Sequence, residues 1–331
     1  MPKRMIRRTL FLAVLIAALL IPAALPRAIA QQTQTPQESS QTLKVQVNLV
    51  NVYATVRDKR HAIVPDLKKE DFHIFEDGVE QKVDSVALET ELPLTFAILV
   101  DTSGSVERLL GAEQSTASRF LERVMRKTDL AMLISFDLSA DELQGFTSDV
   151  AELERGINRA RINTGGSARV TPDTFPTNGN LGTVLYDAVY LACREKLAGE
   201  AGRKAIIILT DAEDNGSKVS LEESIEAAQR SDTVIHILLQ SDSSFGGFGR
   251  SGGGVARKMT NETGGRLVEV RSEKDLQKAF DQISEELRGQ YRLSYYPANP
   301  ARDGKFRRIR VESTRSDTKI TARQGYYAPR H

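Results

Sequence analysis

A short run of oxygen-bearing side chains follows an apolar segment that has the composition of a buried strand. The run lies in FAILVDTSGSV, residues 96–106, and places Asp101, Ser103 and Ser105 at alternate positions. Alternate side chains of an extended chain point the same way, so one carboxylate and two hydroxyls can face one point. Such oxygens suit a hard divalent cation such as Mg²⁺. Because Asp and Ser also cap helices, the run alone fits either a cap or a metal site.

Two further segments are expected to bring oxygens to the same edge of a sheet. Gly182 and Thr183 open a stretch with helical periodicity, and Asp211 follows the apolar strand KAIIIL and Thr210. In an open parallel sheet, ligands bind at the carboxyl ends of the strands. The combination favours a cation site. A cation held by so few charges stays electrophilic and has room for an oxygen from a partner.

The elements that position these residues alternate between strand and helix. The predicted strands share an apolar, β-branched composition and lie at residues 94–100, 129–137, 142–146, 204–209, 233–239 and 266–270. The predicted helices lie at residues 105–127, 149–161, 183–198, 220–230, 254–263 and 273–288. Nearly continuous apolar strands between helices indicate a sheet covered on both faces. We therefore predict an α/β fold with a doubly wound, mostly parallel sheet over residues 92–288.

Both flanks of this region read as β structure. Residues 43–91 alternate between apolar and polar, and DFHIFEDGVEQKVDSVAL reads as two strands joined at Asp77-Gly78. Residues 289–331 hold further β segments, the last being KITARQGYY. Each flank is too short to offset its chain entropy alone. We expect one small β-sandwich-like domain into which the α/β domain is inserted, with two separate appendages as the alternative.

The first thirty residues have the three-part pattern of a secretory signal peptide. A basic start is followed by an apolar stretch over residues 10–25 and by the small residues Ala28 to Ala30. Cleavage after Ala30 would leave a polar linker over residues 31–42, and an uncleaved segment would serve as a membrane anchor. In both cases we expect an exported protein that is periplasmic, extracellular or at the cell surface.

The pattern Asp-x-Ser-x-Ser, then a distant Thr and a distant Asp, resembles the metal-ion-dependent adhesion site (MIDAS) of von Willebrand factor type A domains. It falls on Asp101, Ser103, Ser105, Thr183 and Asp211. The resemblance implies that the first three bind the metal directly, that Thr183 binds it as well, and that Asp211 acts partly through water. It also implies Mg²⁺, with Mn²⁺ or Ca²⁺ as alternatives, and a protein ligand whose Asp or Glu carboxylate completes the site. The flanks and the ending QGYYAP are similar to exported bacterial relatives of that family.

Other motifs predict less. Residues 211–222 nearly match an EF-hand loop, but a strand and not a helix precedes them. GFGRSG, residues 247–252, matches a dinucleotide pattern but stands too far from its strand. Cys193 and His236 each read as buried core residues.

The composition and the missing catalytic motifs limit the function. The net charge of +1 gives no reason to expect nucleic acid, and no nucleotide is expected either. No G-x-S-x-G or H-E-x-x-H motif occurs, so we expect no enzyme. A divalent-metal-dependent hydrolase and a structural envelope protein with a purely structural metal remain the alternatives. Contact with a membrane is expected only through an uncleaved signal segment.

Overall fold

The computed structural model describes residues 49–107, 110–163, 182–240 and 250–330. The chain from Val47 to His331 forms one compact unit. The predicted signal peptide and linker, residues 1–30 and 31–42, lie outside the described residues. Among the helices that are described, none combines the length and the apolar character needed to cross a membrane.

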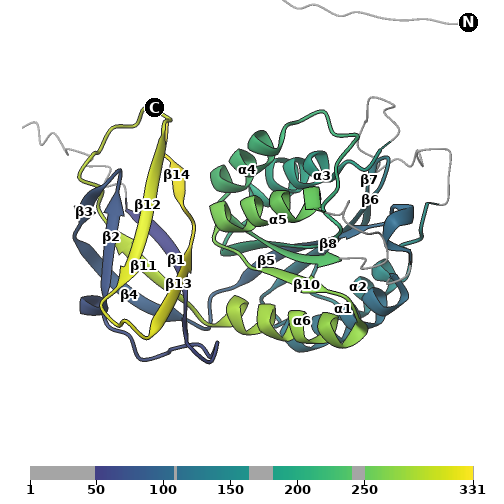
Figure 1. The fold of residues 1–331 in the computed structure, drawn as a ribbon, viewed down its shortest axis with the longest axis horizontal. Coiled ribbons are helices and arrows are strands. Elements are labelled where there is room, and N and C mark those ends of the chain that lie inside the picture. The colour runs from purple at the N-terminus through teal and green to yellow at the C-terminus, as the bar shows by residue number, and fades with distance from the viewer. Residues whose placement is uncertain (1–48, 108–109, 164–181, 241–249, 331) are drawn as a thin grey trace, which may run out of the picture. The chain divides into compact units, whose positions relative to one another are not determined.

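A 6-stranded sheet in the order β10-β9-β8-β5-β6-β7 forms the centre of the α/β region (Figure 1). Its strands are β5 (Leu94–Asp101), β6 (Leu130–Phe136), β7 (Ala140–Thr147), β8 (Arg203–Thr210), β9 (Thr233–Gln240) and β10 (Leu267–Val270). All neighbours pair in parallel except β6 and β7, which are antiparallel. The prediction of an α/β fold with a mostly parallel sheet is confirmed.

Helices cover both faces of this sheet because alternate residues of its strands point to opposite sides. Leu94, Phe96 and Ile98 pack into one core with α1 (Leu110–Val124), α2 (Val150–Ile157) and α6 (Glu273–Arg288). The intervening residues Ala97 and Leu99 pack into a second core on the other face. The helices of that face are α3 (Leu185–Leu191), α4 (Leu221–Arg230) and α5 (Arg250–Thr263), and a π-helical segment, η3 (Ala192–Leu197), continues α3. Figure 1 shows these two sets of helices above and below the sheet.

Two 4-stranded sheets are built from the flanks of the α/β region. The first has the order β13-β1-β11-β4 and the second the order β14-β12-β2-β3. Their strands are β1 (Val50–Asp58), β2 (Phe72–Glu76), β3 (Val79–Gln81), β4 (Val83–Glu89), β11 (Gln290–Tyr295), β12 (Phe306–Ser313), β13 (Thr318–Ala322) and β14 (Gly325–Tyr327). Each sheet pairs strands from before residue 91 with strands from after residue 289, as β11 does with β1 and β4. A shared core that includes Val52, Ile74 and Leu293 joins the sheets, in agreement with the predicted β-sandwich-like part.

The described strands and helices correct some predicted boundaries. DFHIFEDGVEQKVDSVAL holds three strands and not two, because the chain leaves β3 of one sheet and enters β4 of the other at Lys82. KITARQGYY likewise divides into β13 and β14. The hairpin at Asp77-Gly78 is confirmed, since both residues have the positive φ that such a tight turn requires.

The helix predicted from residue 105 also begins later than expected. Gly104–Val106 is a 3₁₀ turn, η2, and α1 begins at Leu110. The helix predicted from residue 183 begins at Leu185. Both corrections free candidate ligand residues from the helices, so Ser105 and Thr183 belong to the connections that lead into α1 and α3.

Candidate metal centre

Asp101 is the last residue of β5, and its side chain is fully buried. Its Oδ1 accepts a hydrogen bond from Ser103 N at 2.9 Å, and its Oδ2 accepts one from Thr210 Oγ1 at 2.6 Å. Burial raises its pKa to about 7, the bonds from Ser103 and Thr210 oppose that rise, and the charge of Asp211 adds to it. A cation beside this carboxylate would favour its ionised form.

Ser103 and Ser105 hold their hydroxyls together at the turn after β5. Ser103 Oγ lies 2.9 Å from Ser105 Oγ, and Ser103 N is bound to Asp101. Ser103 is the extended residue that precedes the 3₁₀ turn over Gly104–Val106, and Ser105 lies within that turn. Hydrogen bonds therefore link Asp101, Ser103 and Ser105 into one group.

Asp211 follows β8 directly, at the level of Asp101 in the neighbouring strand. The register pairs Val100 with Leu209, so Thr210 stands beside Asp101 and Asp211 lies one residue beyond. Asp211 Oδ1 accepts a hydrogen bond from Glu213 N at 3.0 Å. Ala212, with φ of 58°, occupies the left-handed region that is costly for a residue with a side chain. Such strain next to a candidate ligand is typical of functional loops.

Thr183 is tied to the loop after β8 through its backbone. Its carbonyl accepts hydrogen bonds from Asn215 N at 3.1 Å and from Gly216 N at 3.0 Å. The two segments approach so closely that a Cβ on Gly216 would lie 2.3 Å from the carbonyl oxygen of Gly182. Glycines at these two positions therefore let the segment that carries Thr183 reach the loop that follows Asp211.

Glu113 is a carboxylate of this edge that the sequence reasoning missed. It lies on α1 and is buried, and its Oε1 accepts a hydrogen bond from Gln240 Nε2 at the end of β9. Its Oε2 has no partner among the described residues. Burial raises its pKa to about 8, and the charge of Asp101 contributes. The sequence did hold a signal, because Glu113 occupies the same helical stripe as Leu110, Ala117 and Phe120, where a carboxylate is unusual.

The residues of this edge fit a hard divalent cation by their chemistry. The candidate set offers two carboxylates, Asp101 and Asp211, and three hydroxyls, from Ser103, Ser105 and Thr183. Burial raises the pKa of Asp101 and of Glu113, and the charge of Asp101 adds to the rise at Glu113, so a positive ion at this edge would stabilise both carboxylates in ionised form. In the described part of the chain, no group of three or more His, Cys, Asp or Glu side chains is placed to hold a metal.

The other motifs and residues considered in the sequence have structural roles wherever the structure describes them. β8 precedes residues 211–222, so the EF-hand alternative lacks its first helix. Within that segment, Asp214 accepts hydrogen bonds from Tyr186 N at 3.0 Å and from Ser217 Oγ at 2.6 Å, and so fixes the start of α3. Most of GFGRSG lies outside the described residues. Cys193 is buried as expected, and its pKa is raised to about 12 by burial.

Comparison with known proteins finds similarity in the fold. No family model and no curated protein matches the sequence. The chain is similar to the solved structure of BatB, a conserved hypothetical protein from Bacteroides thetaiotaomicron, at 20% identity and a TM-score of 0.45, over 59% of this chain and 98% of that one. A von Willebrand factor type A structure from Catenulispora acidiphila matches at 10% identity and a TM-score of 0.48, over 86% of this chain and 74% of that one.

A third similar structure is proximal thread matrix protein 1 from the mussel byssus. It matches at 14% identity and a TM-score of 0.49 over 64% of this chain, which spans 50% of that protein's length. A structure of that protein has a zinc-occupied MIDAS motif. At these identities the likeness concerns the fold alone. Solved von Willebrand factor type A domains are among the structures that the chain resembles, as the motif led us to expect.

Proposed function

We propose that this protein is a metal-dependent protein-binding module. The observation that carries the proposal is the edge at the carboxyl ends of β5 and β8. There the buried carboxylate of Asp101 lies beside the paired hydroxyls of Ser103 and Ser105, and the charge of Asp211 raises its pKa. A divalent ion at this edge is the simplest compensation for these carboxylates.

The residues of the edge would bind Mg²⁺ in different ways. Asp101, Ser103 and Ser105 would bind it directly, and Thr183 and Asp211 would complete the set, partly through water. A bound Mg²⁺ would supply a Lewis-acidic position that accepts an oxygen from outside the chain. An Asp or Glu carboxylate on a protein partner is the ligand that fits, because it adds negative charge where the site carries little.

Two further parts of the proposal concern the setting. The signal-like segment over residues 1–30 supports export, with the binding face presented in the periplasm or at the cell surface. Binding without catalysis is the part of the proposal that rests on the sequence, in which no G-x-S-x-G or H-E-x-x-H motif occurs.

A capture experiment tests the function. The mature chain is immobilised and exposed to an envelope extract in Mg²⁺, in EDTA, and as the Asp211→Asn variant. We expect proteins retained in Mg²⁺ to be lost in EDTA and with the variant. Glu213→Gln is the matched control, because Glu213 is an exposed acid two residues away whose backbone, not its side chain, contacts Asp211.

Two outcomes would contradict the proposal. If EDTA lowers only the melting temperature and leaves the retained proteins unchanged, the metal is structural. If the protein hydrolyses extract components in Mg²⁺ and the Asp211→Asn variant does not, the site is that of a hydrolase.

A further inference from the structure

A cleft of about 810 Å³ lies at the edge of the sheet opposite to the metal centre. Its walls are the end of β1 with the following turn, the C-terminal half of α5, the start of β10, and β13. β10 runs parallel to β9, and the cleft is lined by residues 265–267, at its amino end. Asp101 and the other candidate metal ligands lie at the carboxyl ends of the strands and do not line the cleft, so the cleft is a separate site. Its volume is in the range of small-ligand pockets.

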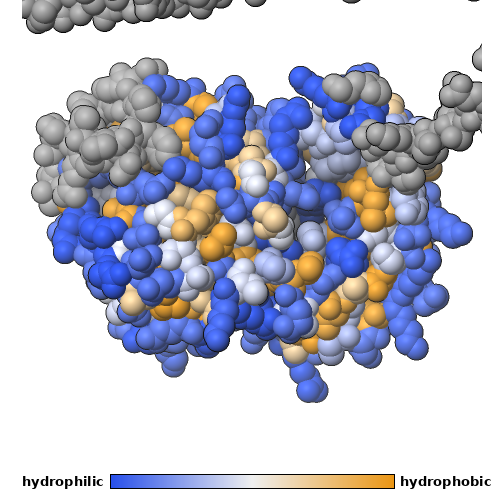
Figure 2. All heavy atoms as spheres, turned by 180° about the vertical axis from the view of Figure 1, so that it is seen from behind, coloured by the Kyte–Doolittle hydropathy of each residue, from blue (hydrophilic) through white to orange (hydrophobic). Residues whose placement is uncertain are grey.

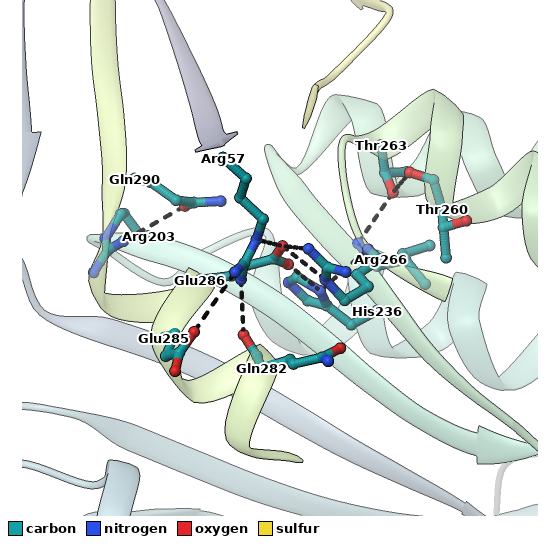
Figure 3. A network of polar contacts seen from close by, with 11 residues as sticks. Arg57, Arg203, His236, Thr260, Thr263, Arg266, Gln282, Glu285, Glu286 and Gln290 are labelled. Carbon is teal, nitrogen blue, oxygen red and sulfur yellow. Dashed lines mark hydrogen bonds and ion pairs between the residues drawn. The ribbon is translucent and has the colours of Figure 1, made fainter. Parts of the chain in front are cut away.

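The floor of the cleft is a cluster of ionic side chains that already pair with one another. Glu286 Oε1 accepts hydrogen bonds from Arg57 Nε at 3.1 Å and from Arg266 Nε at 2.7 Å, and Arg57 also reaches the carbonyl of Gln282 (Figure 3). Burial of Glu286 opposes its ionisation, but these cations together hold its pKa below the usual value. This cluster forms a rigid base and offers few free donors.

The acids around the cleft are also engaged. Asp58 Oδ1 accepts the backbone N–H groups of Arg60 and Ala62 at 2.8 and 2.9 Å. Glu269 pairs with Arg271 at 3.1 Å, and Asp317 pairs with Arg315 at 3.5 Å. Neither of these two arginines lines the cleft. Each of these acidic side chains is therefore already hydrogen-bonded or ion-paired to a neighbouring group.

Three cationic side chains of the rim are not engaged in this way. Lys59, Arg257 and Lys319 are exposed and line the cleft from the turn after β1, from α5 and from β13. Within the described ranges none of the three makes an ion pair. Asn261, one turn after Arg257 on α5, adds an amide to the same wall. Positive charge therefore converges on the cleft from three separate elements.

We infer that this cleft binds a small multivalent oxyanion, one that carries two or more carboxylate or phosphate groups. Three cations on different walls suit a ligand with several charges better than a single-charged one. The concave shape raises the local potential above that of the same charges on a convex surface. A group of spaced oxyanions can contact Lys59, Arg257 and Lys319 at once while the Glu286 cluster stays intact.

The test titrates the metal-free full chain, freed of chelator by buffer exchange, with citrate, tripolyphosphate and inorganic phosphate by calorimetry, which keeps the metal centre out of the measurement. The cleft variant combines Lys59→Gln, Arg257→Gln and Lys319→Gln. The control combines Lys82→Gln, Lys127→Gln and Arg155→Gln, which removes the same charge from exposed positions that do not line the cleft. We expect citrate or tripolyphosphate to bind at least tenfold more weakly to the cleft variant and unchanged to the control.

If citrate binds more tightly than tripolyphosphate, the cleft recognises carboxylate groups, and the reverse order indicates phosphate groups. Inorganic phosphate should bind more weakly than either. An equal loss in both triple variants would show non-specific attraction and overturn the inference. Absence of binding by all three probes at millimolar concentration would overturn it as well. Circular dichroism and melting temperature of both variants confirm that each is folded.

Discussion

Asp101 is held in position by the protein itself, since each of its two oxygens accepts a hydrogen bond from the chain. Thr210 is the more telling partner, because its hydroxyl donates to Asp101 Oδ2 and accepts from Ala212 N at 2.9 Å. It thereby connects the carboxylate of β5 to the strained turn after β8. At this scale, the site is a preorganised carboxylate whose remaining lone pairs are available to a cation.

Thr210→Val tests this positioning. The substitution keeps the shape but removes the bond to Asp101, which lowers stability by about 1 kcal/mol and raises the pKa of Asp101 further. We expect Mg²⁺ affinity to fall several-fold, as measured by calorimetry. Thr95→Val is the control, since its hydroxyl bonds Ala201 O at the other end of the sheet. Equal affinities for the two variants would show that Thr210 does not position the carboxylate.

His236 gives a pH dependence of stability that is independent of the metal. It is buried in β9, its Nδ1 accepts Arg266 N at 3.2 Å, and its Nε2 has no partner among the described residues. Burial lowers its pKa to about 4, against the opposing effect of Glu286 and with the help of Arg266. Between about pH 6.5 and 4 the unfolded chain binds the extra proton, so stability must fall as the pH falls.

His236→Gln should flatten this part of the stability profile. The slope from one group is at most about 1.4 kcal/mol per pH unit, and Glu286, whose pKa is lowered, keeps its charge over most of this window. Urea unfolding at pH 4.5, 5.5 and 6.5 measures the difference between wild type and variant. His73→Gln, at an exposed position beside Glu80, is the control. A variant whose profile runs parallel to the wild type would contradict the assignment.

Glycines determine how closely the elements around the metal centre approach. A Cβ on Gly252, near the start of α5, would lie 2.1 Å from the carbonyl oxygen of Asp211. The helix can therefore pack against the strained segment of Asp211 and Ala212 only with glycine at this position. The nearby Gly254 has nothing within 4 Å of such a Cβ.

Gly252→Ala and Gly254→Ala form a matched pair in the same helix. The first should displace the loop after β8 and weaken Mg²⁺ binding tenfold or more, with a loss of stability of about 1–3 kcal/mol. The second should leave binding unchanged and stabilise the helix by about 0.5–1 kcal/mol. Calorimetry and thermal unfolding of both proteins give the comparison. Identical effects would show that contact with Asp211 does not shape the site.

The sequence predicted the helices and strands well where periodicity carries the information, and the site less completely. The strand FAILV and its motif predicted β5 and the turn after it, but not that Asp101 would be buried, since burial depends on Thr210 and α1 from elsewhere in the chain. Glu113 was missed because it has no motif. The change of sheet at Lys82 could not be read either, because alternation of apolar residues does not tell which sheet a strand joins.

At the scale of the whole molecule, the two ends of the chain meet in the same small sheets. β11 follows α6 directly and lies between β1 and β4, with Leu293 in the shared core (Figure 1). We propose that residues 43–91 and 289–331 fold as one domain with residues 92–288 inserted. The face of the molecule in Figure 2 is mainly hydrophilic, with apolar residues in small separate groups.

Truncation after Gly289 and the full-length variant Leu293→Asp both test the shared domain. The truncation removes β11, the strand that joins β1 to β4, and Leu293→Asp places a charge in the shared core, so amides of Val50–Asp58 should lose hydrogen-exchange protection in both proteins. Amides of β6, in the α/β sheet, serve as the internal control and should keep theirs. Undiminished protection of β1 in both proteins would show that the flanks fold separately.

The central claim is that the edge formed by β5 and β8 binds one Mg²⁺. Calorimetric titration of the chain with Mg²⁺, alongside Asp101→Asn and Glu213→Gln, tests it most directly. Asparagine has nearly the size of the buried aspartate but lacks its charge, so the fold can be kept while the main ligand is lost. The account predicts one site in the wild type and in Glu213→Gln, and binding weakened at least a hundredfold in Asp101→Asn. Undiminished Mg²⁺ affinity in a folded Asp101→Asn protein, or no Mg²⁺ binding by the wild type, would contradict it.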